Sequence, residues 1–290
     1  MRFTVIKAMI KKRKNMSRQE NRQRQDGYTL IELAISIVVV GLLLVPASGL
    51  YGLYVKDQKI KKTEFSISRA QDAIGGFRSL YGRYPCPAKD NVGPSHPDYG
   101  YEAIDAMGNC TLTPVVSLNS DPTVTNKNVH IGSLPFRELN MQEQDTIDGY
   151  GARLLYAVTE SLTNDTTFDV RNGVITILDV AGNNMTTPPD SAHFVVMTSN
   201  EHNDGMRSRN GVLVGACPAG PALENENCNG DSVFRMGSKR ADFDDRLISN
   251  SPIGMTVWQY SETNPDHIHL TSAYHVAIGV DDTINLTSAA

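Results

Sequence analysis

The chain has 290 residues, of which 40% are hydrophobic and 20% are charged, and its net charge is -5. This composition excludes an intrinsically disordered chain, because enough apolar side chains are present to form a core. It also excludes a polytopic membrane protein, because one stretch alone is long and apolar enough to cross a bilayer.

Basic charge is concentrated at the amino terminus. Residues 1–27 contain nine basic and two acidic side chains, whereas the rest of the chain contains 18 basic and 30 acidic ones. Such an acidic body is unsuited to nonspecific binding of nucleic acid, so we expect no nucleic-acid partner. The basic residues stand directly before the apolar stretch, as they do in membrane-targeting segments.

The apolar stretch runs from Leu33 to Val55 without a charged residue, with Glu32 before it and Lys56 after it. As a helix it is long enough to cross the hydrocarbon layer. Because basic flanks stay in the cytoplasm, the remainder of the chain is expected on the far side. The stretch fits a signal peptide cleaved before Ser48, an uncleaved signal anchor, or a third possibility that depends on the residues at its front.

The front of the stretch reads Gly27-Tyr28-Thr29-Leu30-Ile31-Glu32-Leu33 and follows the basic leader. It resembles the prepilin cleavage and methylation signature of type IV pilins and type II secretion pseudopilins. The resemblance implies that a prepilin peptidase cuts after Gly27 on the cytoplasmic side and methylates the new amino terminus on Tyr28, where the family more often has Phe. The leader is long for this family, and a translation start at Met16 instead of Met1 would shorten it.

The carboxylate of Glu32 stands at the membrane end of the apolar helix, where a charge is costly unless it is paired or protonated. Cleavage after Gly27 would place a positive amine four residues before Glu32. When helices bundle, that amine can meet the Glu32 carboxylate of a neighbouring subunit, partly neutralise it and fix the axial register. The alternative is that Glu32 lies at the depth of the lipid headgroups, where a charge costs little.

Gly41 and Pro46 interrupt the transmembrane and assembly helix that we expect at residues 28–55. Proline removes a backbone hydrogen bond and kinks a helix, and glycine lowers helix stability. The family resemblance implies that the segment from Gly41 to Pro46 melts and stretches during filament assembly. The alternative is that the small residues allow close packing between helices.

Residues 56–81 continue with helical periodicity, because apolar side chains recur at steps of three, four or seven residues. The members of this apolar face are Ile60, Ile67, Ala70, Ile74, Phe77 and Tyr81. Pro85 prevents the helix from continuing. We expect an amphipathic continuation of the first helix that lies on a globular, β-rich domain formed by residues 82–290.

The expected domain begins with residues 82–135, whose Pro, Gly, Asn and Asp content predicts long loops with little regular structure. Strand patterns follow at residues 154–158, 174–180, 193–197, 257–260 and 267–278. One long helix followed by an antiparallel sheet indicates an α+β fold, and the family resemblance implies its pilin-like form. The segments 82–87 and 148–154 also resemble large pseudopilin-like proteins.

The four cysteines are expected to form disulfides, because all lie on the non-cytoplasmic side, where disulfides persist. They are Cys86, Cys110, Cys217 and Cys228. Four cysteines allow three connectivities. Pairing of neighbours along the chain, Cys86 with Cys110 and Cys217 with Cys228, would bridge two long loops, each closure adding about 2–4 kcal/mol of stability. Zinc binding is the alternative, although the sequence has no Cys-x-x-Cys spacing.

Several loops are rich in acidic and amide side chains, whose oxygens can bind calcium. The candidate ligands are Asp204, Asp231, Asp244 and Asp245. Their spacing matches no calcium-loop pattern, and the alternative is that these loops are simply solvated. His267 and His269 would share one face of a strand and, with His275 nearby, could bind a transition metal; surface positions without a ligand are the simpler interpretation.

The sequence contains no Gly-x-Ser-x-Gly, His-Glu-x-x-His, phosphate-loop or dinucleotide-binding motif, so we do not expect an enzyme. The expected function is that of a structural subunit of a type IV pilus or a type II secretion filament. Such a chain is a single-pass protein of the bacterial inner membrane with its carboxy-terminal domain in the periplasm. Its expected partners are other pilin or pseudopilin subunits, the prepilin peptidase, the inner-membrane assembly platform and the lipid bilayer.

The size of the domain, residues 82–290, favours a minor subunit, because bulky domains pack poorly along a dense filament. The sequence does not separate a pilus from a secretion pseudopilus. The alternative from a different class is a periplasmic protein, for instance a hydrolase, that an amino-terminal signal exports or anchors and that joins no filament.

Overall fold

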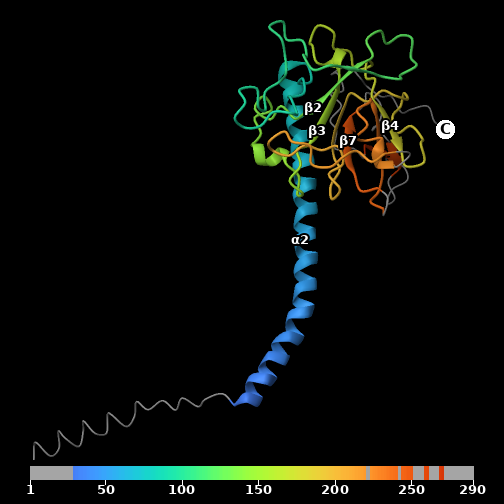
Figure 1. Cartoon of the computed structure of the whole chain (residues 1–290). Coiled ribbons are helices and arrows are strands. Elements are labelled where there is room, and N and C mark those ends of the chain that lie inside the picture. Colours follow the sequence, from blue (N-terminus) through green and yellow to red (C-terminus); the bar gives the residue numbers. More distant parts are fainter. Residues whose placement is uncertain (1–28, 220–222, 241–242, 251–257, 261–267, 271–290) are drawn as a thin grey trace, which may run out of the picture. The chain divides into compact units, whose positions relative to one another are not determined.

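The structure is a computed structural model that describes residues 29–219, 223–240, 243–250, 258–260 and 268–270 (Figure 1). The side chains of residues 43–48, 258–260 and 268–270 are outside this description. The chain divides into two compact units, residues 1–56 and residues 57–290. The leader, with Gly27, and Tyr28 lie outside the described residues, as does the part of the last expected strand beyond residue 270.

Helix α2 (Leu30–Tyr81) contains both expected helical segments in one element. At its start, the Thr29 hydroxyl accepts a hydrogen bond from the backbone N–H of Glu32 at 3.3 Å, which satisfies one of the free N–H groups of the first turn. At its end, the N–H of Gly82 donates to the carbonyl oxygen of Arg78 at 2.8 Å, and Gly82 has φ = +70°. Glycine adopts this left-handed conformation without a Cβ penalty, so it ends the helix.

A membrane-spanning helix is expected at residues 33–55. Within the described part of the chain, no helix is both long enough and apolar enough to cross a membrane. The side chains of residues 43–48, inside the expected span, are among those that the structure leaves undescribed. The membrane span therefore stays a prediction.

The second unit is built on a five-stranded antiparallel sheet with the strand order β1-β2-β3-β5-β7. Its strands are β1 (Val115–Val116), β2 (Asn128–Ser133), β3 (Leu155–Thr159), β5 (Phe194–Thr198) and β7 (Arg246–Asn250). Two further pairs are the parallel β4 (Thr176–Asp179) with β6 (Val233–Met236) and the antiparallel β8 (Trp258–Tyr260) with β9 (Ile268–Leu270). Short 3-10 helices are η1 (Glu143–Thr146), η2 (Glu160–Leu162) and η3 (Leu223–Asn225). One helix and an antiparallel sheet confirm the α+β class.

Three predicted strands are confirmed as β3, β4 and β5, and β8 and β9 lie at the other two predicted positions. The prediction of loops with little regular structure at residues 82–135 is wrong for β2, which pairs with β3 from Val129 opposite Thr159 to Ser133 opposite Leu155. Asparagine and glycine give β2 a low intrinsic strand propensity, so its pairing with β3 decides its conformation. The sequence also did not predict β6 and β7.

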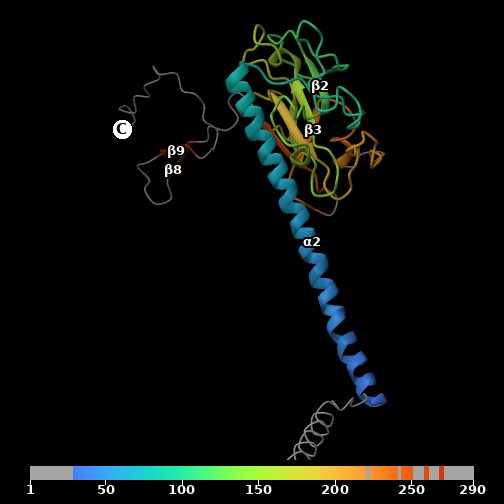
Figure 2. The same cartoon turned by 90° about the vertical axis from the view of Figure 1, so that its left-hand side faces the viewer.

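Apolar side chains cover both faces of the sheet. On one face, Ile67, Ala70, Ile74 and Phe77 of α2 form a core with alternate residues of β3 and β5, namely Tyr156, Val158, Phe194 and Val196. On the other face, the intervening residues Ala157, Val195 and Met197 pack with Ile177 of β4 and Phe234 of β6. This alternation is the period of two that a strand imposes on its side chains. Figure 2 shows α2 beside β2 and β3. The expected apolar face of α2 is confirmed at these four helix residues, whereas Ile60 is half-buried and Tyr81 is 54% exposed.

A tight turn at residues 147–152 attaches the domain to α2. The carboxylate of Asp148 accepts hydrogen bonds from the backbone N–H groups of Tyr150 and Ala152 at 2.8 and 2.9 Å. The N–H of Gly149 donates to the Thr63 hydroxyl of α2 at 3.0 Å. A Cβ atom on Gly149 would overlap with the carbonyl oxygen of Lys59. Glycine is therefore required here because the turn touches the backbone of the helix.

Two disulfides close loops of the domain. They join Cys86 to Cys110 and Cys217 to Cys228, each with a Cα–Cα distance of 5.6 Å. The predicted pairing of neighbouring cysteines is confirmed, and the zinc alternative for these residues is wrong because no thiol is left to bind a metal.

His193, directly before β5, is buried at 2% exposure. Its Nε2 lies 2.7 Å from the carbonyl oxygen of Val170, which can only accept a hydrogen bond, so Nε2 carries the proton. Nδ1 then accepts from the Tyr84 hydroxyl at 3.1 Å, and Tyr84 in turn accepts from the Asn250 side chain at 3.2 Å. Burial lowers the pKa of His193 to about 4, since the charged ring would lose hydration in this site.

Acidification is expected to destabilise the domain through His193. Because its folded pKa of about 4 lies below the value of ~6.5 for an unfolded chain, the unfolded state binds the extra proton between these values. The stability that neutral His193 contributes to the folded domain is complete above pH ~6.5 and is lost as the pH falls toward 4. From pH 7 to pH 4.5, the wild type should lose about 2 kcal/mol more unfolding free energy than His193→Gln, which keeps a donor and an acceptor but does not titrate. Urea unfolding of the full-length chain measures both losses, and equal losses would contradict the prediction.

Candidate functional site

The first turn of α2 presents the Glu32 carboxylate. The Thr29-x-x-Glu32 spacing is that of a capping box, and the Ser36 hydroxyl donates to the Glu32 carbonyl oxygen at 2.7 Å. A negative side chain is favourable here because the amino-terminal end of a helix carries partial positive charge. Among the described residues, no group forms a hydrogen bond or ion pair with the carboxylate itself.

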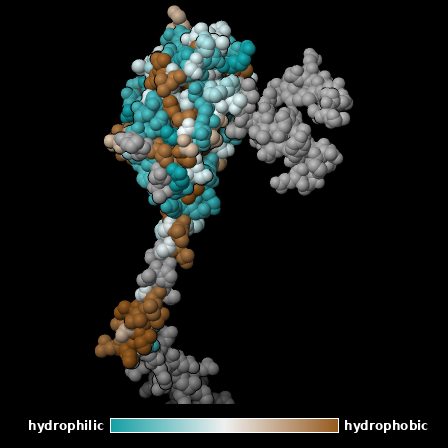
Figure 3. All heavy atoms as spheres, turned by 90° about the vertical axis from the view of Figure 1, so that its right-hand side faces the viewer, coloured by the Kyte–Doolittle hydropathy of each residue, from teal (hydrophilic) through white to brown (hydrophobic). Residues whose placement is uncertain are grey.

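Apolar side chains follow Glu32 along α2 and lie open. The large hydrophobic residues described between 30 and 42 and between 50 and 54 are 48% to 89% exposed. In Figure 3 they form a hydrophobic surface on the helix. An apolar surface of this extent is typical of a protein or membrane contact. The first half of α2 therefore carries an exposed apolar surface.

The remaining residues of the predicted amino-terminal site are only partly described. Gly27 and Tyr28 are outside the described residues, and so is the side chain of Pro46. Gly41 lies within α2, where a Cβ atom would meet nothing within 4 Å. The structure thus places Glu32 on the first turn and leaves its predicted partner amine on Tyr28 untested.

The amino-terminal segment that contains Glu32 matches the model of a known family. Residues 22–48 match the family model of the prokaryotic N-terminal methylation motif. The chain carries the signature of type IV pilins and pseudopilins. The matched segment contains Gly27, Tyr28, Glu32, Gly41 and Pro46, and it ends before the domain begins. No curated protein and no solved structure matches the chain.

The methylation motif implies two partners. Proteins that carry it are substrates of a prepilin peptidase, and they associate with other pilin subunits. The motif also indicates a pilin-like protein anchored in a membrane. These statements concern the amino-terminal segment alone.

Of the four aspartates named as calcium candidates, Asp244 alone belongs to a group of potential metal ligands among the described residues. Asp244 and Asp245 are adjacent and buried, at 2% and 3% exposure. Asp231 belongs to a local turn, in which its backbone N–H donates to the Asn229 side chain at 2.9 Å and its carboxylate accepts from the Val233 N–H at 2.8 Å. Within the described residues, Asp244 groups with Glu224, which lies in another of the acidic loops, and with His202, which the sequence did not single out.

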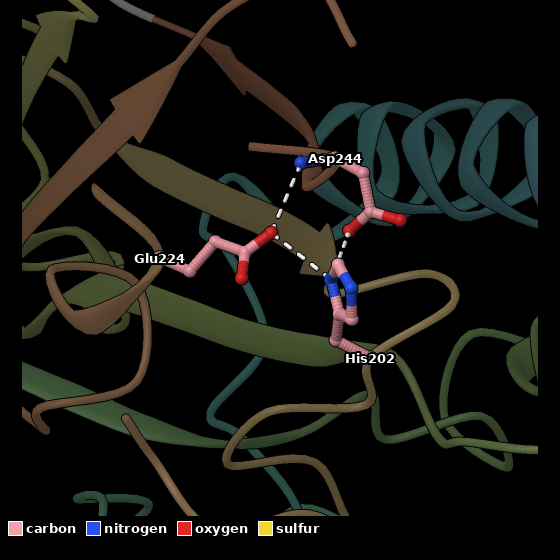
Figure 4. A group of neighbouring side chains, drawn as sticks. All are labelled: His202, Glu224 and Asp244. Atoms are coloured by element: carbon pink, nitrogen blue, oxygen red, sulfur yellow. Dashed lines mark hydrogen bonds and ion pairs between the residues drawn. The ribbon is translucent and has the colours of Figure 1, made fainter. Parts of the chain in front are cut away.

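His202, Glu224 and Asp244 converge on one point (Figure 4). Nδ1 of His202 lies 3.1 Å from Oε1 of Glu224 and 3.3 Å from Oδ1 of Asp244. Their potential ligand atoms all lie within 4.8 Å of one another. We call these three residues the carboxylate–histidine cluster. It combines one imidazole nitrogen with two carboxylate oxygens, a ligand set that proteins use for divalent cations.

Each member of the cluster comes from a different part of the domain. His202 follows β5, Glu224 lies in η3 inside the loop closed by the Cys217–Cys228 disulfide, and Asp244 precedes β7. Some 20 residues separate successive members, so no local spacing could have revealed the cluster. The antiparallel pairing of β5 with β7 and the disulfide bring them together.

Negative charge dominates around the cluster. Burial lowers the pKa of His202, but the Asp244 and Glu224 carboxylates outweigh this and leave it raised. Burial raises the pKa of Glu224. Burial, followed by repulsion from Glu224 and Asp244, raises the pKa of Asp245 to about 7. Lys239 is the neighbouring cation, with Nζ 3.4 Å from Oδ2 of Asp244.

Proposed function

We propose that this chain is a structural, non-enzymatic subunit of a type IV pilus or a type II secretion filament. The observation that carries the proposal is the methylation motif at residues 22–48, which stands at the start of a helix whose apolar side chains are exposed. A prepilin peptidase removes residues 1–27, and the mature helix then packs against the helices of other subunits. The domain would share the pilin-like fold, which its order of one helix and an antiparallel sheet supports.

Glu32 sets the register between subunits in this proposal. Cleavage after Gly27 creates an amine on Tyr28, and that amine pairs with the Glu32 carboxylate of the neighbouring subunit. Both charges are costly in an apolar surround unless they are paired. Support comes from the Glu32 carboxylate, which has no partner among the described residues of its own chain. Gly41 and Pro46 would allow the helix to stretch during assembly, since both residues weaken a helix.

The proposed location before assembly is the bacterial inner membrane. The basic leader stays in the cytoplasm, residues 33–55 cross the bilayer once, and the domain lies in the periplasm. Two disulfides support a non-cytoplasmic domain, because disulfides persist in oxidising compartments. The inner-membrane assembly platform would extract the subunit from the lipid. The large domain favours a minor subunit over the most abundant one.

A periplasmic protein with an ordinary export signal is the second candidate. The two candidates differ at the amino terminus of the mature chain. A filament subunit begins at a methylated Tyr28, whereas an exported protein begins near Ser48 and an anchored one keeps its leader. Mass spectrometry of the chain isolated from a host with a prepilin peptidase distinguishes them.

A further inference from the structure

We propose that His202, Glu224 and Asp244 bind one divalent cation of the zinc class. Bound there, the cation links η3, in the loop closed by the Cys217–Cys228 disulfide, to the segments that follow β5 and precede β7. It would be a structural ion that fixes this loop to the sheet, and it is independent of the amino-terminal helix.

The distances within the cluster fit such an ion. Zinc binds imidazole nitrogen and carboxylate oxygen at about 2.0–2.2 Å, so in a tetrahedral site the ligand atoms lie about 3.3–3.6 Å from one another. Nδ1 of His202 lies 3.1 Å from the Glu224 oxygen and 3.3 Å from the Asp244 oxygen. Both distances are within a few tenths of an ångström of the tetrahedral values, and the Glu224 and Asp244 oxygens lie within 4.8 Å of each other.

A buried oxygen atom of Asp244 also points into the cluster. Asp244 is 2% exposed, and its Oδ1 accepts no hydrogen bond in the described part of the chain. Lys239 approaches the other carboxylate oxygen, Oδ2. A polar neighbour of Oδ1 is Nδ1 of His202, which forms an ion pair with it only when the ring is protonated. With a neutral ring the buried oxygen has no donor, which is costly. Because Oδ1 faces His202 (Figure 4), a cation in the cluster would satisfy it.

The backbone around the cluster already holds two of the ligands in place. The N–H of Asp244 donates to Oε1 of Glu224 at 3.2 Å, and the Asn200 side chain donates to the Asp244 carbonyl oxygen. The Asn227 N–H donates to the Glu224 carbonyl oxygen at 3.3 Å, one residue before Cys228 and its disulfide. Ligands held by such outer contacts bind a metal more tightly, because little ordering remains to be done.

The ligand set favours zinc over the calcium that the acidic loops suggested. Calcium takes six to eight oxygen ligands, whereas an imidazole nitrogen is a preferred ligand of zinc, copper, nickel and iron. The cluster supplies one imidazole and two carboxylates. Asp204, Asp231 and Asp245 are not ligands in this site.

Metal titration of the full-length chain in detergent, with its disulfides intact and after dialysis against EDTA, tests the proposal. Isothermal titration with ZnCl2 should show one saturable site per chain. His202→Gln and Glu224→Gln should each weaken binding at least about tenfold, in line with the loss of a ligand contact. His96→Gln is the matched control, because His96 is also about half exposed and lies beside Asp98, yet is outside the cluster. A hundredfold excess of CaCl2 should not displace the zinc.

A variant with His267, His269 and His275 all replaced by glutamine removes the competing explanation that zinc binds to the carboxy-terminal histidines. This variant should keep the site. The proposal is overturned if no saturable zinc binding occurs, if calcium displaces zinc, or if His202→Gln binds as tightly as His96→Gln. Loss of zinc binding in the variant without His267, His269 and His275 would overturn it as well.

Discussion

Replacing Glu32 with alanine is expected to lower the amount of the chain in assembled filaments at least about tenfold, with membrane insertion unchanged. Without the carboxylate, the amine on Tyr28 would enter an apolar bundle unpaired, and an unpaired buried charge costs several kcal/mol. Each 1.4 kcal/mol corresponds to about a tenfold change in an association constant. The measurement is the quantity of the chain in sheared filaments relative to the quantity in the membrane fraction.

Glu64→Ala is the control for this effect. Glu64 lies on the same helix, is 56% exposed in its side chain and pairs with Arg246 at 3.2 Å. An exposed ion pair contributes about 0–1 kcal/mol, so Glu64→Ala should assemble nearly as the wild type does. Equal amounts of the Glu32→Ala and Glu64→Ala proteins in filaments would contradict the pairing of Glu32 with a neighbouring amine.

Gly149→Ala is expected to destabilise the domain by about 2 kcal/mol or more, the upper part of the range for overpacked sites. The new methyl group would overlap with the carbonyl oxygen of Lys59, and a helix backbone cannot move aside as a flexible side chain can. The turn would have to shift away from α2, which also breaks the hydrogen bond from Gly149 to Thr63. Urea unfolding of the full-length chain, compared with the wild type, measures the loss.

Gly76→Ala provides the matched control on the helix. A Cβ atom at Gly76 would meet nothing within 4 Å, and replacing a helical glycine by alanine stabilises by about 0.5–1 kcal/mol. The two glycine-to-alanine changes should therefore have opposite signs. A Gly149→Ala protein as stable as the wild type would show that the turn does not touch α2 closely.

Features with a local sequence signal were predictable in this chain. The buried face of α2 follows the helical period of Ile67, Ala70, Ile74 and Phe77, and β3 and β5 are runs of apolar residues that form strands at the centre of the sheet. Both disulfides join neighbours along the chain. In each case the residues that determine the structure lie close together in the sequence.

Features that depend on distant partners were not predictable. β2 contains His130 and Gly132 and becomes a strand through its pairing with β3. The members of the carboxylate–histidine cluster meet only after β5 and β7 have paired. Conversely, the amino-terminal motif is readable because its residues are consecutive in the sequence. The assembly function proposed for it depends on contacts between chains.

The amino terminus of the mature chain tests the central claim most directly. Mass spectrometry would compare the chain from an otherwise identical pair of hosts, one with an active prepilin peptidase and one without it. With the enzyme, the chain should begin at Tyr28 and carry one added methyl group, and without it the leader should remain. A mature chain that begins near Ser48, or that keeps residues 1–27 in both hosts, would contradict the account.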